Sequence, residues 1–415
     1  MNIKITPTIL KGKVNIPPSK SVAHRLIIAA GLADGESVIS NIYMSKDIIA
    51  TIEAMKTLGA EITSHDDGNG LYTITVKGIT NPAPNSVIDC NESGSTLRFL
   101  IPVASILGIN ATFIGRGRLP ERPITPYLTE MTKNGVEFDY RDTMPFSVSG
   151  KLRAGEYKIA GDISSQFITG LLLALSVAEG ESKIILTSHL ESRPYVDITI
   201  DCLNKFGAQI EETSNGFIVK GVKALTPHNE AVEGDYSQAA FFAVANRLGC
   251  DINIEGLNDN SFQGDKKIIE ICEKIVYNSD KNELRPFDID CSDIPDLVPI
   301  LAVLGSFCNG VSYIRNAARL RIKESDRLSA ISNALNAVGG KVKEFDDGLE
   351  ITGVDFLTGG EIDSCNDHRI PMAMTIASTR CKGELIIKGA ECISKSYPDF
   401  FEVCKSLGGI IDVID

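Results

Sequence analysis

Apolar and polar residues follow a pattern that recurs along the whole chain. A turn rich in Ser, Asp, Asn and Gly opens directly onto an almost wholly apolar helical segment. Six such segments begin at residues 18, 91, 161, 234, 292 and 366, at spacings of 73, 70, 73, 58 and 74 residues. Self-similarity at a regular period is typical of a repeat architecture. The sequence therefore predicts six copies of one unit, of which one is short.

A second, amphipathic helix follows the first and ends at a glycine before a β-type run. The clear examples are residues 47–59, 123–135, 197–207, 326–339 and 399–408. Glycine after the last helical turn is the expected left-handed cap. Because β-branched runs such as 71–76 and 384–387 lie between the helices, each unit is predicted to read strand, helix, strand, helix and then strands.

The first helix of each unit is apolar on nearly every side, as residues 171–177 and 241–245 illustrate. A helix that is hydrophobic all round is buried, so the pattern predicts an α/β fold with helices inside and sheets outside. A chain of 415 residues also exceeds the ~250 to 300 residues at which a single core stops growing. Two domains are therefore expected.

Composition and charge narrow the possible partners. Lys and Arg number 41 against 54 Asp and Glu, a net charge of −13, which argues against nucleic acid or a membrane as a partner. The N-terminus shows no secretory signal, and apolar runs such as 170–178 fall short of the ~18 residues of a membrane span. A soluble, cytoplasmic protein is predicted. Its ten scattered cysteines lack zinc-site spacing and are expected to be free, mostly buried thiols.

The polar turns at the helix starts are candidate binding sites. Ser, Thr, Asp and Asn cap the free amides of a helix start, and the same amides attract phosphate or carboxylate. A cap alone explains any single start. Basic residues, however, crowd these starts: Lys20, Arg25, Arg98, Arg122, Lys323, Arg327, Arg369 and Lys395. Because a cation there opposes the helix dipole, this placement indicates a function in binding anions.

Two carboxylates lie among these cations. Asp296 follows Ile294-Pro295, and Glu324 stands between Lys323 and Ser325. An acid beside a lysine is either a surface ion pair or a proton shuttle tuned by its neighbours. The segment Asp367-His368-Arg369 has the same two interpretations, and the residues alone leave both open.

Nine motifs, in order and at characteristic spacing, resemble the enolpyruvyl transferases, and within them the 5-enolpyruvylshikimate-3-phosphate synthase family. The motifs are Pro18-Ser19-Lys20-Ser21 with Arg25; Ser93-Gly94-Ser95-Thr96-Leu97-Arg98; Leu119-Pro120-Glu121-Arg122-Pro123-Ile124; Asp162-Ile163-Ser164-Ser165-Gln166; Ser192-Arg193-Pro194-Tyr195; Ile294-Pro295-Asp296; Arg321-Ile322-Lys323-Glu324-Ser325-Asp326-Arg327; Asn366-Asp367-His368-Arg369; and Lys395-Ser396-Tyr397-Pro398-Asp399. The match spans nearly the whole chain.

The resemblance implies a two-lobed, inside-out α/β barrel with three βαβαββ units in each lobe. One lobe is expected over residues 20–232 and binds mainly shikimate 3-phosphate. The other joins residues 1–19 to 233–415 and carries the catalytic carboxylates and the Arg and Lys residues for phosphoenolpyruvate. Substrates are expected to bind between the lobes, which close over them.

The family reaction transfers the enolpyruvyl group of phosphoenolpyruvate to the 5-hydroxyl of shikimate 3-phosphate, and phosphate leaves after addition and elimination. This step belongs to the shikimate pathway to chorismate and the aromatic amino acids. The resemblance implies no metal and no organic cofactor. It also implies two small-molecule partners, a monomeric chain and inhibition by glyphosate.

The family's binding residues carry over to this chain by motif. Those for shikimate 3-phosphate are Lys20, Ser21, Arg25, Ser164, Ser165, Gln166, Ser192, Tyr195, Asp296, Arg319 and Lys323. Those for phosphoenolpyruvate are Lys20, Gly94, Arg122, Gln166, Arg327, Arg369 and Lys395. Arg319 stands where some members have Asn, and it could add a grip on the shikimate phosphate.

The implied catalytic residues are Asp296, Glu324, Lys20, Lys323 and His368. Asp296 is expected to be the base for the 5-hydroxyl and Glu324 the acid for the methylene carbon, with the two lysines as possible relays. Both carboxyl groups would need perturbed pKa values, since one must hold a proton among cations.

Three alternative functions compete with this one. UDP-N-acetylglucosamine enolpyruvyl transferase uses a catalytic Cys on the loop corresponding to 115–123, which here reads Gly-Arg-Gly-Arg-Leu-Pro-Glu-Arg-Pro and contains none. RNA 3'-phosphate cyclase is related in architecture, but neither its nucleotide signature nor a basic surface is present. The third is a non-catalytic repeat protein that binds anionic metabolites.

Overall fold

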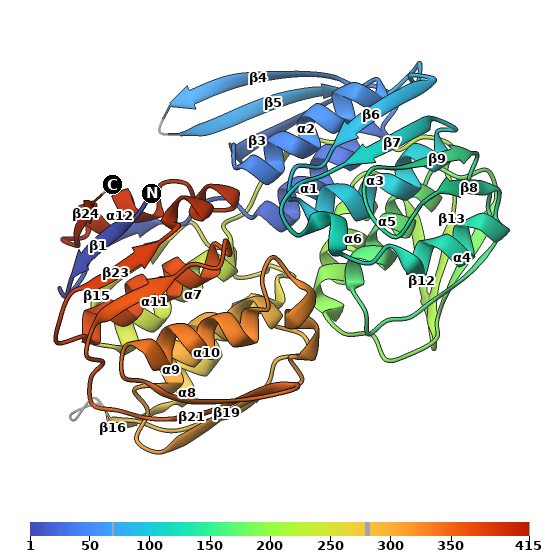
Figure 1. Ribbon diagram of the computed structural model, residues 1–415. Coiled ribbons are helices and arrows are strands. Elements are labelled where there is room, and N and C mark those ends of the chain that lie inside the picture. The colour runs from blue at the N-terminus through green and yellow to red at the C-terminus, as the bar shows by residue number, and fades with distance from the viewer. Residues whose placement is uncertain (69, 279–282, 415) are drawn as a thin grey trace. The chain divides into compact units, whose positions relative to one another are not determined.

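The computed structural model describes residues 1–68, 70–278 and 283–414, and the chain divides into two compact units. We call Pro18–Glu233 the N-lobe, and Met1–Pro17 together with Gly234–Asp415 the C-lobe. The sequence had placed the boundaries at 19/20 and 232/233. Figure 1 labels the elements of both units.

The N-lobe consists of three βαβαββ copies, each with a four-stranded sheet. The second copy has sheet order β6-β7-β9-β8 and the third β10-β11-β13-β12. Their elements are β6(Asn85–Asp89), α3(Gly94–Ile106), β7(Asn110–Ile114), α4(Thr125–Lys133), β8(Val136–Asp139), β9(Phe146–Gly150), β10(Glu156–Ile159), α5(Ser165–Leu175), β11(Glu181–Leu186), α6(Arg193–Lys205), β12(Gln209–Thr213) and β13(Gly216–Lys220). In each copy a helix joins the first two strands, which are therefore parallel.

The first copy of the N-lobe takes one strand from the end of the lobe. Its elements are α1(Lys20–Gly31), β3(Glu36–Tyr43), α2(Lys46–Leu58), β4(Glu61–Gly68), β5(Leu71–Lys77) and β14(Glu230–Ala231). Strand β14 pairs in parallel with β3, opposite Ile39 and Ser40, which gives the order β14-β3-β5-β4. The end of the lobe thus supplies the strand that this copy lacks at its beginning.

The C-lobe has two complete copies and one short one. The complete copies consist of β18(Asp288–Asp290), α9(Val298–Gly305), β19(Val311–Arg315), α10(Arg327–Ala337), β20(Lys341–Phe345), β21(Gly348–Thr352), β22(Gly360–Asp363), α11(Arg369–Ala377), β23(Leu385–Lys388), α12(Phe400–Ser406), β24(Ile410–Val413) and β1(Ile3–Thr6). Strand β1 pairs with both β23 and β24, and Figure 1 shows this blue strand among the red ones.

The short copy departs from the predicted unit. It contains β2(Lys11–Asn15), α7(Tyr236–Arg247), β15(Asp251–Glu255), α8(Lys267–Lys274), β16(Val276–Asn278) and β17(Glu283–Leu284). Its strands form two separate pairs, β15-β2 and β16-β17, where the other copies have a four-stranded sheet. This copy is also the one with the short spacing, 58 residues, to the next repeat.

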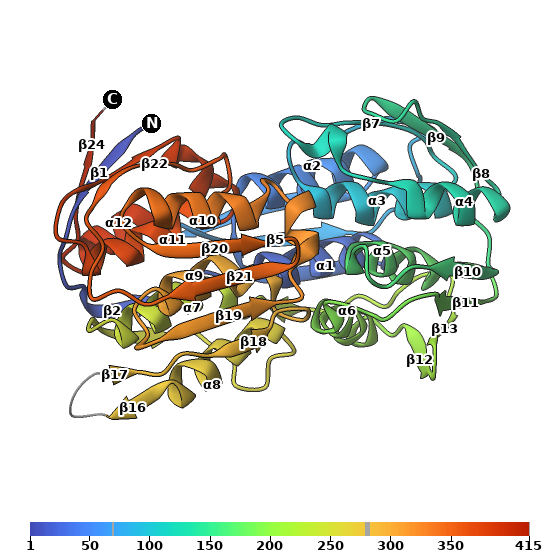
Figure 2. The same ribbon diagram turned by 60° about the horizontal axis from the view of Figure 1, so that its bottom comes forward.

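The first helix of each copy lies in the interior, as predicted. In α5, the residues Phe167, Leu171 and Leu175 have no exposed surface. Figure 2 shows α3 and α5 side by side, with β7 and β9 beyond one and β11 and β13 beyond the other. This arrangement confirms the inside-out α/β fold class and leaves the helix starts as the places where polar side chains gather.

Two of these helices, α1 and α3, begin earlier than the hydrophobic pattern predicts. The sequence places their starts at Ala23 and Leu97, whereas α1 begins at Lys20 and α3 at Gly94. Ser19 and Ser93 accept hydrogen bonds from backbone amides as N-caps, so the polar motif itself forms the first helical turn. Lys20 of α1 and Gly94 of α3 are therefore the first residues of a helix and do not lie on the preceding loop.

Two further expectations concern cysteines and membranes. All ten cysteines are free thiols, and most of them are buried, as predicted. Among the described residues, no helix combines the length and apolarity needed to cross a bilayer.

Candidate functional site

Lys20 is the first residue of α1 and is fixed by an acid from the next helix. Its Nζ lies 2.9 Å from Oδ2 of Asp47, which is in the first turn of α2. Both side chains are largely buried. Asp47 also suits its own position, because an acid in the first turn complements the helix dipole. The ion pair therefore holds the ammonium group of Lys20 at the start of α1.

Arg25 lies one turn farther along α1 and is buried. Its guanidinium donates to the hydroxyl of Thr199 at 2.7 Å and to the backbone oxygens of Ser21 and Tyr195 at 2.6 and 2.9 Å. Its cation also lies 5.1 Å from the ring centroid of Phe99. Burial lowers the pKa of Arg25 to about 10, because only neutral groups replace its water. The group links α1 to α6 and leaves its charge uncompensated by these partners.

Gln166 and two arginines form a second group at the starts of α3 and α5. Arg98 donates to Oε1 of Gln166 at 2.7 Å, and Gln166 donates to Oγ of Ser95 at 3.0 Å. A Cβ on Gly94 would meet Nη1 of Arg122 at 2.5 Å. Glycine thus makes room for the guanidinium of Arg122 against the helix start.

The positive charges of this group act on one another. Burial, with a smaller contribution from the charge of Arg122, lowers the pKa of Arg98 to about 9. Arg98 also lies 5.0 Å from the ring centroid of Phe167. Since Arg98 donates to Gln166 and to the carbonyl of Pro123, which are both neutral, the group is a region of positive potential suited to an anion.

The remaining N-lobe candidates lie at two more helix starts. Ser164 is the N-cap of α5 and accepts from the amide of Gln166, while Ser165 is buried in the first turn. Ser192 is the N-cap of α6 and has φ 55° and ψ 40°. A left-handed backbone is unusual for a residue other than glycine, and such strain gathers at functional sites. The next turn places Tyr195, whose backbone oxygen Arg25 contacts.

A chain of uncharged groups joins three helices beneath these residues. Nδ1 of His24 lies 2.7 Å from the hydroxyl of Thr51, which lies 2.7 Å from that of Thr96. Thr96 in turn donates to Ser93 at 2.8 Å. Burial, then the charges of Lys20 and Arg25, hold the pKa of His24 well below its ordinary value. A neutral imidazole therefore ties α1 and α2 to the N-cap of α3.

In the C-lobe, one buried arginine gathers three carboxylates. Arg327, the first residue of α10, has a side chain 2% exposed. It contacts Asp296 at 3.0 Å, Glu324 at 3.3 Å and Asp367 at 2.8 Å. Burial opposes its charge, but the carboxylates, Asp367 foremost, raise the pKa of Arg327 above its ordinary value. The arginine therefore stays charged and brings both predicted catalytic carboxylates together.

Asp296 is held by a second arginine as well. Arg369, the first residue of α11, donates from Nη2 to Oδ2 of Asp296 at 2.8 Å and from Nη1 to its backbone oxygen at 3.1 Å. Oδ1 of Asp296 faces Arg327. The two guanidinium groups fix the orientation of this carboxylate, which is 20% exposed and so remains accessible.

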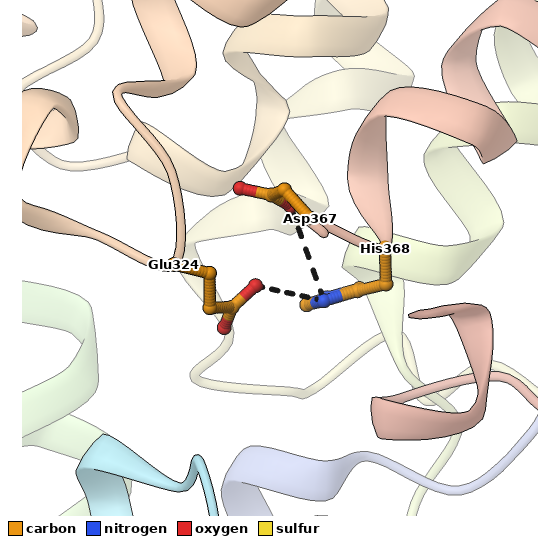
Figure 3. Close-up of side chains that lie close together, drawn as sticks. All are labelled: Glu324, Asp367 and His368. Atoms are coloured by element: carbon orange, nitrogen blue, oxygen red, sulfur yellow. Dashed lines mark ion pairs between the residues drawn. The ribbon is translucent and has the colours of Figure 1, made fainter. Parts of the chain in front are cut away.

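Glu324 lies between Arg327 and His368. Figure 3 shows the carboxylates of Glu324 and Asp367 both directed toward the same ring nitrogen of His368. The Oε2 to Nδ1 distance is 2.8 Å, and Oδ1 of Asp367 lies 4.0 Å from the same nitrogen. His368 is buried at the start of α11. It is therefore placed to orient Glu324 from behind.

Glu324, Asp367 and His368 also have the residue types of a metal site, with ligand atoms within 4.8 Å of one another. The oxygens of Asp367, however, already accept from Arg327, from Ser325 at 3.0 Å and from the amide of Arg369 at 3.0 Å. A divalent cation there would face the guanidinium of Arg327. The donor set fits an arginine better than a metal ion.

Three predicted residues lie around this cluster. Lys395 is 5% exposed, and its Nζ donates to the backbone oxygen of Asn366 at 2.6 Å. Arg319 is 9% exposed and donates to the backbone oxygen of Ser292. Lys323 is half-buried and directly precedes Glu324. Lys395 thus contacts the turn before α11, while Arg319 and Lys323 lie in the segment that precedes α10 in the sequence.

Several residues of these groups were absent from the predicted site. Asp367 and Arg98 lie inside two of the nine motifs, but the resemblance assigned no role to either residue. Asp47 and Thr51 lie in α2 with no motif around them. Only the packing of α2 against α1 brings them to Lys20 and His24, and a single sequence carries no signal for that contact.

Comparison with known proteins gives consistent matches over the full chain. A family model described as EPSP synthase (3-phosphoshikimate 1-carboxyvinyltransferase) matches residues 5–404. The chain is 48% identical to the 3-phosphoshikimate 1-carboxyvinyltransferase of Clostridium perfringens, over 98% of both chains. It is 47% identical to that of Clostridium novyi, over 99% of this chain and 98% of the other.

Solved structures agree with these matches. The structure of EPSP synthase from Acinetobacter baumannii superimposes with a TM-score of 0.81 at 25% identity, and covers 99% of this chain and 100% of that one.

Proposed function

The chain belongs to the EPSP synthase (3-phosphoshikimate 1-carboxyvinyltransferase) family, and from this premise we propose how its own residues carry out the reaction. It is an enolpyruvyl transferase of the shikimate pathway, which leads to the aromatic amino acids. The reaction joins the 5-hydroxyl of shikimate 3-phosphate to the central carbon of phosphoenolpyruvate and releases phosphate. The assignment of residues to these steps is the proposal.

The observation that carries the proposal is that Arg327 contacts Asp296 and Glu324 together. The reaction requires one group that takes a proton from the 5-hydroxyl and another that gives a proton to the methylene carbon. Two carboxyl groups held by one buried cation, in different surroundings, are suited to opposite roles. We assign the base to Asp296 and the acid to Glu324.

In the addition step, Asp296 takes the hydroxyl proton while the oxygen bonds to the central carbon of phosphoenolpyruvate. The π electrons of the double bond take a proton from Glu324, and the methylene becomes a methyl group. In the elimination step the C–O bond to phosphate breaks, a methyl proton returns to Glu324 as the double bond reforms, and the proton held by Asp296 passes to the departing phosphate, which returns both carboxyl groups to their starting states. His368, 2.8 Å from Glu324, orients the acid. Lys20 and Lys323 supply positive charge and are candidate proton relays.

The N-lobe is proposed to bind mainly shikimate 3-phosphate. Hydroxyl and amide groups suit its alcohols, and Lys20 and Arg25 suit its phosphate and carboxylate. The proposed residues are Lys20, Ser21, Arg25, Ser164, Ser165, Gln166, Ser192 and Tyr195, with Asp296, Arg319 and Lys323 from the C-lobe. The lowered pKa values of Arg25 and Arg98 support this role, because they reflect buried positive charge that an anion would stabilise.

Phosphoenolpyruvate is proposed to use cations of both lobes. The residues are Lys20, Gly94, Arg122, Gln166, Arg327, Arg369 and Lys395. Glyphosate, an anionic inhibitor of this family, is then expected to compete with phosphoenolpyruvate, and full activity far above the KM for that substrate would contradict this. We further propose that the protein is a cytoplasmic monomer. Sedimentation at micromolar concentration should then give the mass of a single chain.

The function is tested by phosphate release from phosphoenolpyruvate with shikimate 3-phosphate, UDP-N-acetylglucosamine or no acceptor. Release that depends on shikimate 3-phosphate is expected. Release with the nucleotide sugar alone, or with neither acceptor, would overturn the function.

The two carboxylates are distinguished by isotope exchange in D2O. With both substrates, the intact enzyme should place deuterium at the vinyl carbon through the reversible methyl intermediate. Glu324→Gln should lose this exchange along with turnover. Asp296→Asn should lose turnover but regain exchange from pre-formed tetrahedral intermediate, which already lacks the hydroxyl proton. If Glu324→Gln retains exchange, the acid is another residue.

A further inference from the structure

The first turn of α7 lies against two of the cations proposed for phosphoenolpyruvate, yet no residue of this turn belongs to the nine motifs. Asp235 is its N-cap and accepts from the amides of Ser237 and Gln238. The side chains of this turn are buried, and that of Gln238 is 2% exposed. Each of the two side chains after Tyr236 makes a polar contact with the region around α11.

Ser237 orients Arg369. Its hydroxyl proton is directed to Oδ1 of Asp235 at 2.6 Å, so its oxygen is left to accept from Nη2 of Arg369 at 3.2 Å. The donor direction along this chain is therefore fixed, from Arg369 through Ser237 to Asp235. With Asp296 holding the same guanidinium at 2.8 Å, Arg369 is oriented from two sides before any ligand binds.

Gln238 reaches the segment that carries Lys395. Its Nε2 donates to Oγ of Ser396 at 2.7 Å, and Ser396 directly follows Lys395 at the end of the short helix η6(Ala390–Lys395). Lys395 itself donates to Asn366. The lysine is thus held through its side chain on one side and through its backbone neighbour on the other.

The buried side chain of Gln238 lowers the stability of the fold in a way that an apolar side chain at this position would not. Its Oε1 is buried and has no hydrogen-bond partner among the residues that the structure describes. Exchanging the two amide atoms would only leave the nitrogen unpaired. A buried polar atom without a partner costs about 1 to 3 kcal/mol relative to a satisfied one, whereas leucine would fill the same space without it. Such unsatisfied groups in a core require an explanation.

We propose that Ser237 and Gln238 are positioning residues for phosphoenolpyruvate binding, in which Ser237 orients Arg369 and Gln238 fixes the Lys395–Ser396 segment. The inference rests on the proposed roles of Arg369 and Lys395. The start of α7 would then raise the affinity for phosphoenolpyruvate by holding Arg369 and Lys395 in position, without contacting the substrate itself.

The test compares Gln238→Leu with Ser396→Ala and a control at the other end of the same helix. The control is Asn246→Leu, because the side-chain amide of Asn246 makes two hydrogen bonds with the backbone of Ile252, both 2.8 Å long. KM for each substrate, kcat and the midpoint of urea unfolding are measured for each variant, after the parent protein has shown release that depends on shikimate 3-phosphate.

Gln238→Leu should raise the KM for phosphoenolpyruvate about 3- to 10-fold, the worth of one hydrogen bond, with the KM for shikimate 3-phosphate within about twofold. Its unfolding midpoint should be unchanged or higher. Ser396→Ala should reproduce the KM effect, and the double variant should add little to it, because both remove the same contact. Asn246→Leu should lower the midpoint without a selective effect on KM.

Two results would overturn the inference and leave the proposed function intact. One is an unchanged KM for phosphoenolpyruvate in both Gln238→Leu and Ser396→Ala. The other is a loss of stability in Gln238→Leu with equal changes in both KM values, as a purely structural contact would give. Absence of phosphate release in the parent protein would instead contradict the proposed function itself.

Discussion

The two lobes repeat the same βαβαββ unit but compensate the charges at their helix starts differently. In the N-lobe, Arg25 and Arg98 are buried against hydroxyls, carbonyls and an amide, and burial lowers their pKa values to about 10 and about 9. In the C-lobe, Arg327 is equally buried but contacts three carboxylates, and its pKa is raised. One fold therefore produces a group with uncompensated positive charge in the N-lobe and a cluster of compensated charges in the C-lobe.

The difference indicates a division of labour. A buried cation with neutral partners gains most from an incoming anion, which suits binding. A cation that already holds carboxylates gains less from a further anion, so Arg327 and Arg369 are proposed both to bind phosphoenolpyruvate and to keep the acid and base groups in fixed positions, which suits proton transfer. Four predictions test this contrast.

The largest effect is expected from Arg327→Met. This variant leaves the charges of Asp296, Glu324 and Asp367 without their common partner, and breaking a buried ion pair costs about 3 to 5 kcal/mol. Turnover should also fall below detection. Urea unfolding measures the stability change.

Arg98→Met is the matched N-lobe variant. Because Arg98 donates to the neutral groups of Gln166 and Pro123, the substitution should lower the free energy of unfolding by about 1 to 2 kcal/mol. Equal losses of stability in the two variants would contradict the electrostatic contrast between the lobes.

Glu324→Gln should lower kcat about 10²- to 10⁴-fold, the usual contribution of a general acid, and change the KM values little. Steady-state phosphate release measures this. Asp47→Asn is the N-lobe comparison, since Asp47 pairs with Lys20 but is assigned no proton transfer. Its main effect should be on KM, and a larger kcat loss in Asp47→Asn than in Glu324→Gln would reverse the roles assigned to the lobes.

Gly94→Ala should raise the KM for phosphoenolpyruvate about 10-fold. The new methyl group would lie only 2.5 Å from Nη1 of Arg122 and would displace this guanidinium. The displacement should weaken one charge-assisted contact by about 1.4 kcal/mol. The KM for shikimate 3-phosphate should change less. Substrate titrations separate the two. An unchanged KM for phosphoenolpyruvate would remove Arg122 from its binding site.

The smallest effect concerns pH and His24. Its folded-state pKa is lowered by burial and by Lys20 and Arg25, so below about pH 6.5 the unfolded chain binds a proton that the folded chain does not. Stability should therefore fall with falling pH, by at most about 1.4 kcal/mol per pH unit from this group, and be fully present above pH 6.5. Urea unfolding at several pH values measures the slope.

His24→Asn should lessen this pH dependence, while the same change at His65, which is exposed on β4, should not. A slope that is identical in the parent and His24→Asn would exclude His24 as its source.

Sequence alone determined the repeat, the buried first helices and the motif residues, because each of these is local. A period of about 73 residues, the apolar run 171–177 and the charged turns around Lys20 and Arg327 are all properties of neighbouring residues. The resemblance then supplied the family, which the full-length matches confirm. The roles of the predicted site residues stay predictions.

Tertiary structure decided which groups compensate one another. The contacts of Lys20 with Asp47, of Arg327 with Asp367 and of Gln238 with Ser396 join residues 27, 40 and 158 positions apart. Helix packing sets these contacts, and the residues next to each partner in the sequence do not indicate them. The pairing of β1 with β23 and β24 likewise closes the C-lobe across nearly the whole chain. The same kinds of residues at helix starts thus form a group of arginines with neutral partners in one lobe and a cluster of arginine and carboxylates in the other, because only packing decides whether a buried cation meets a carboxylate.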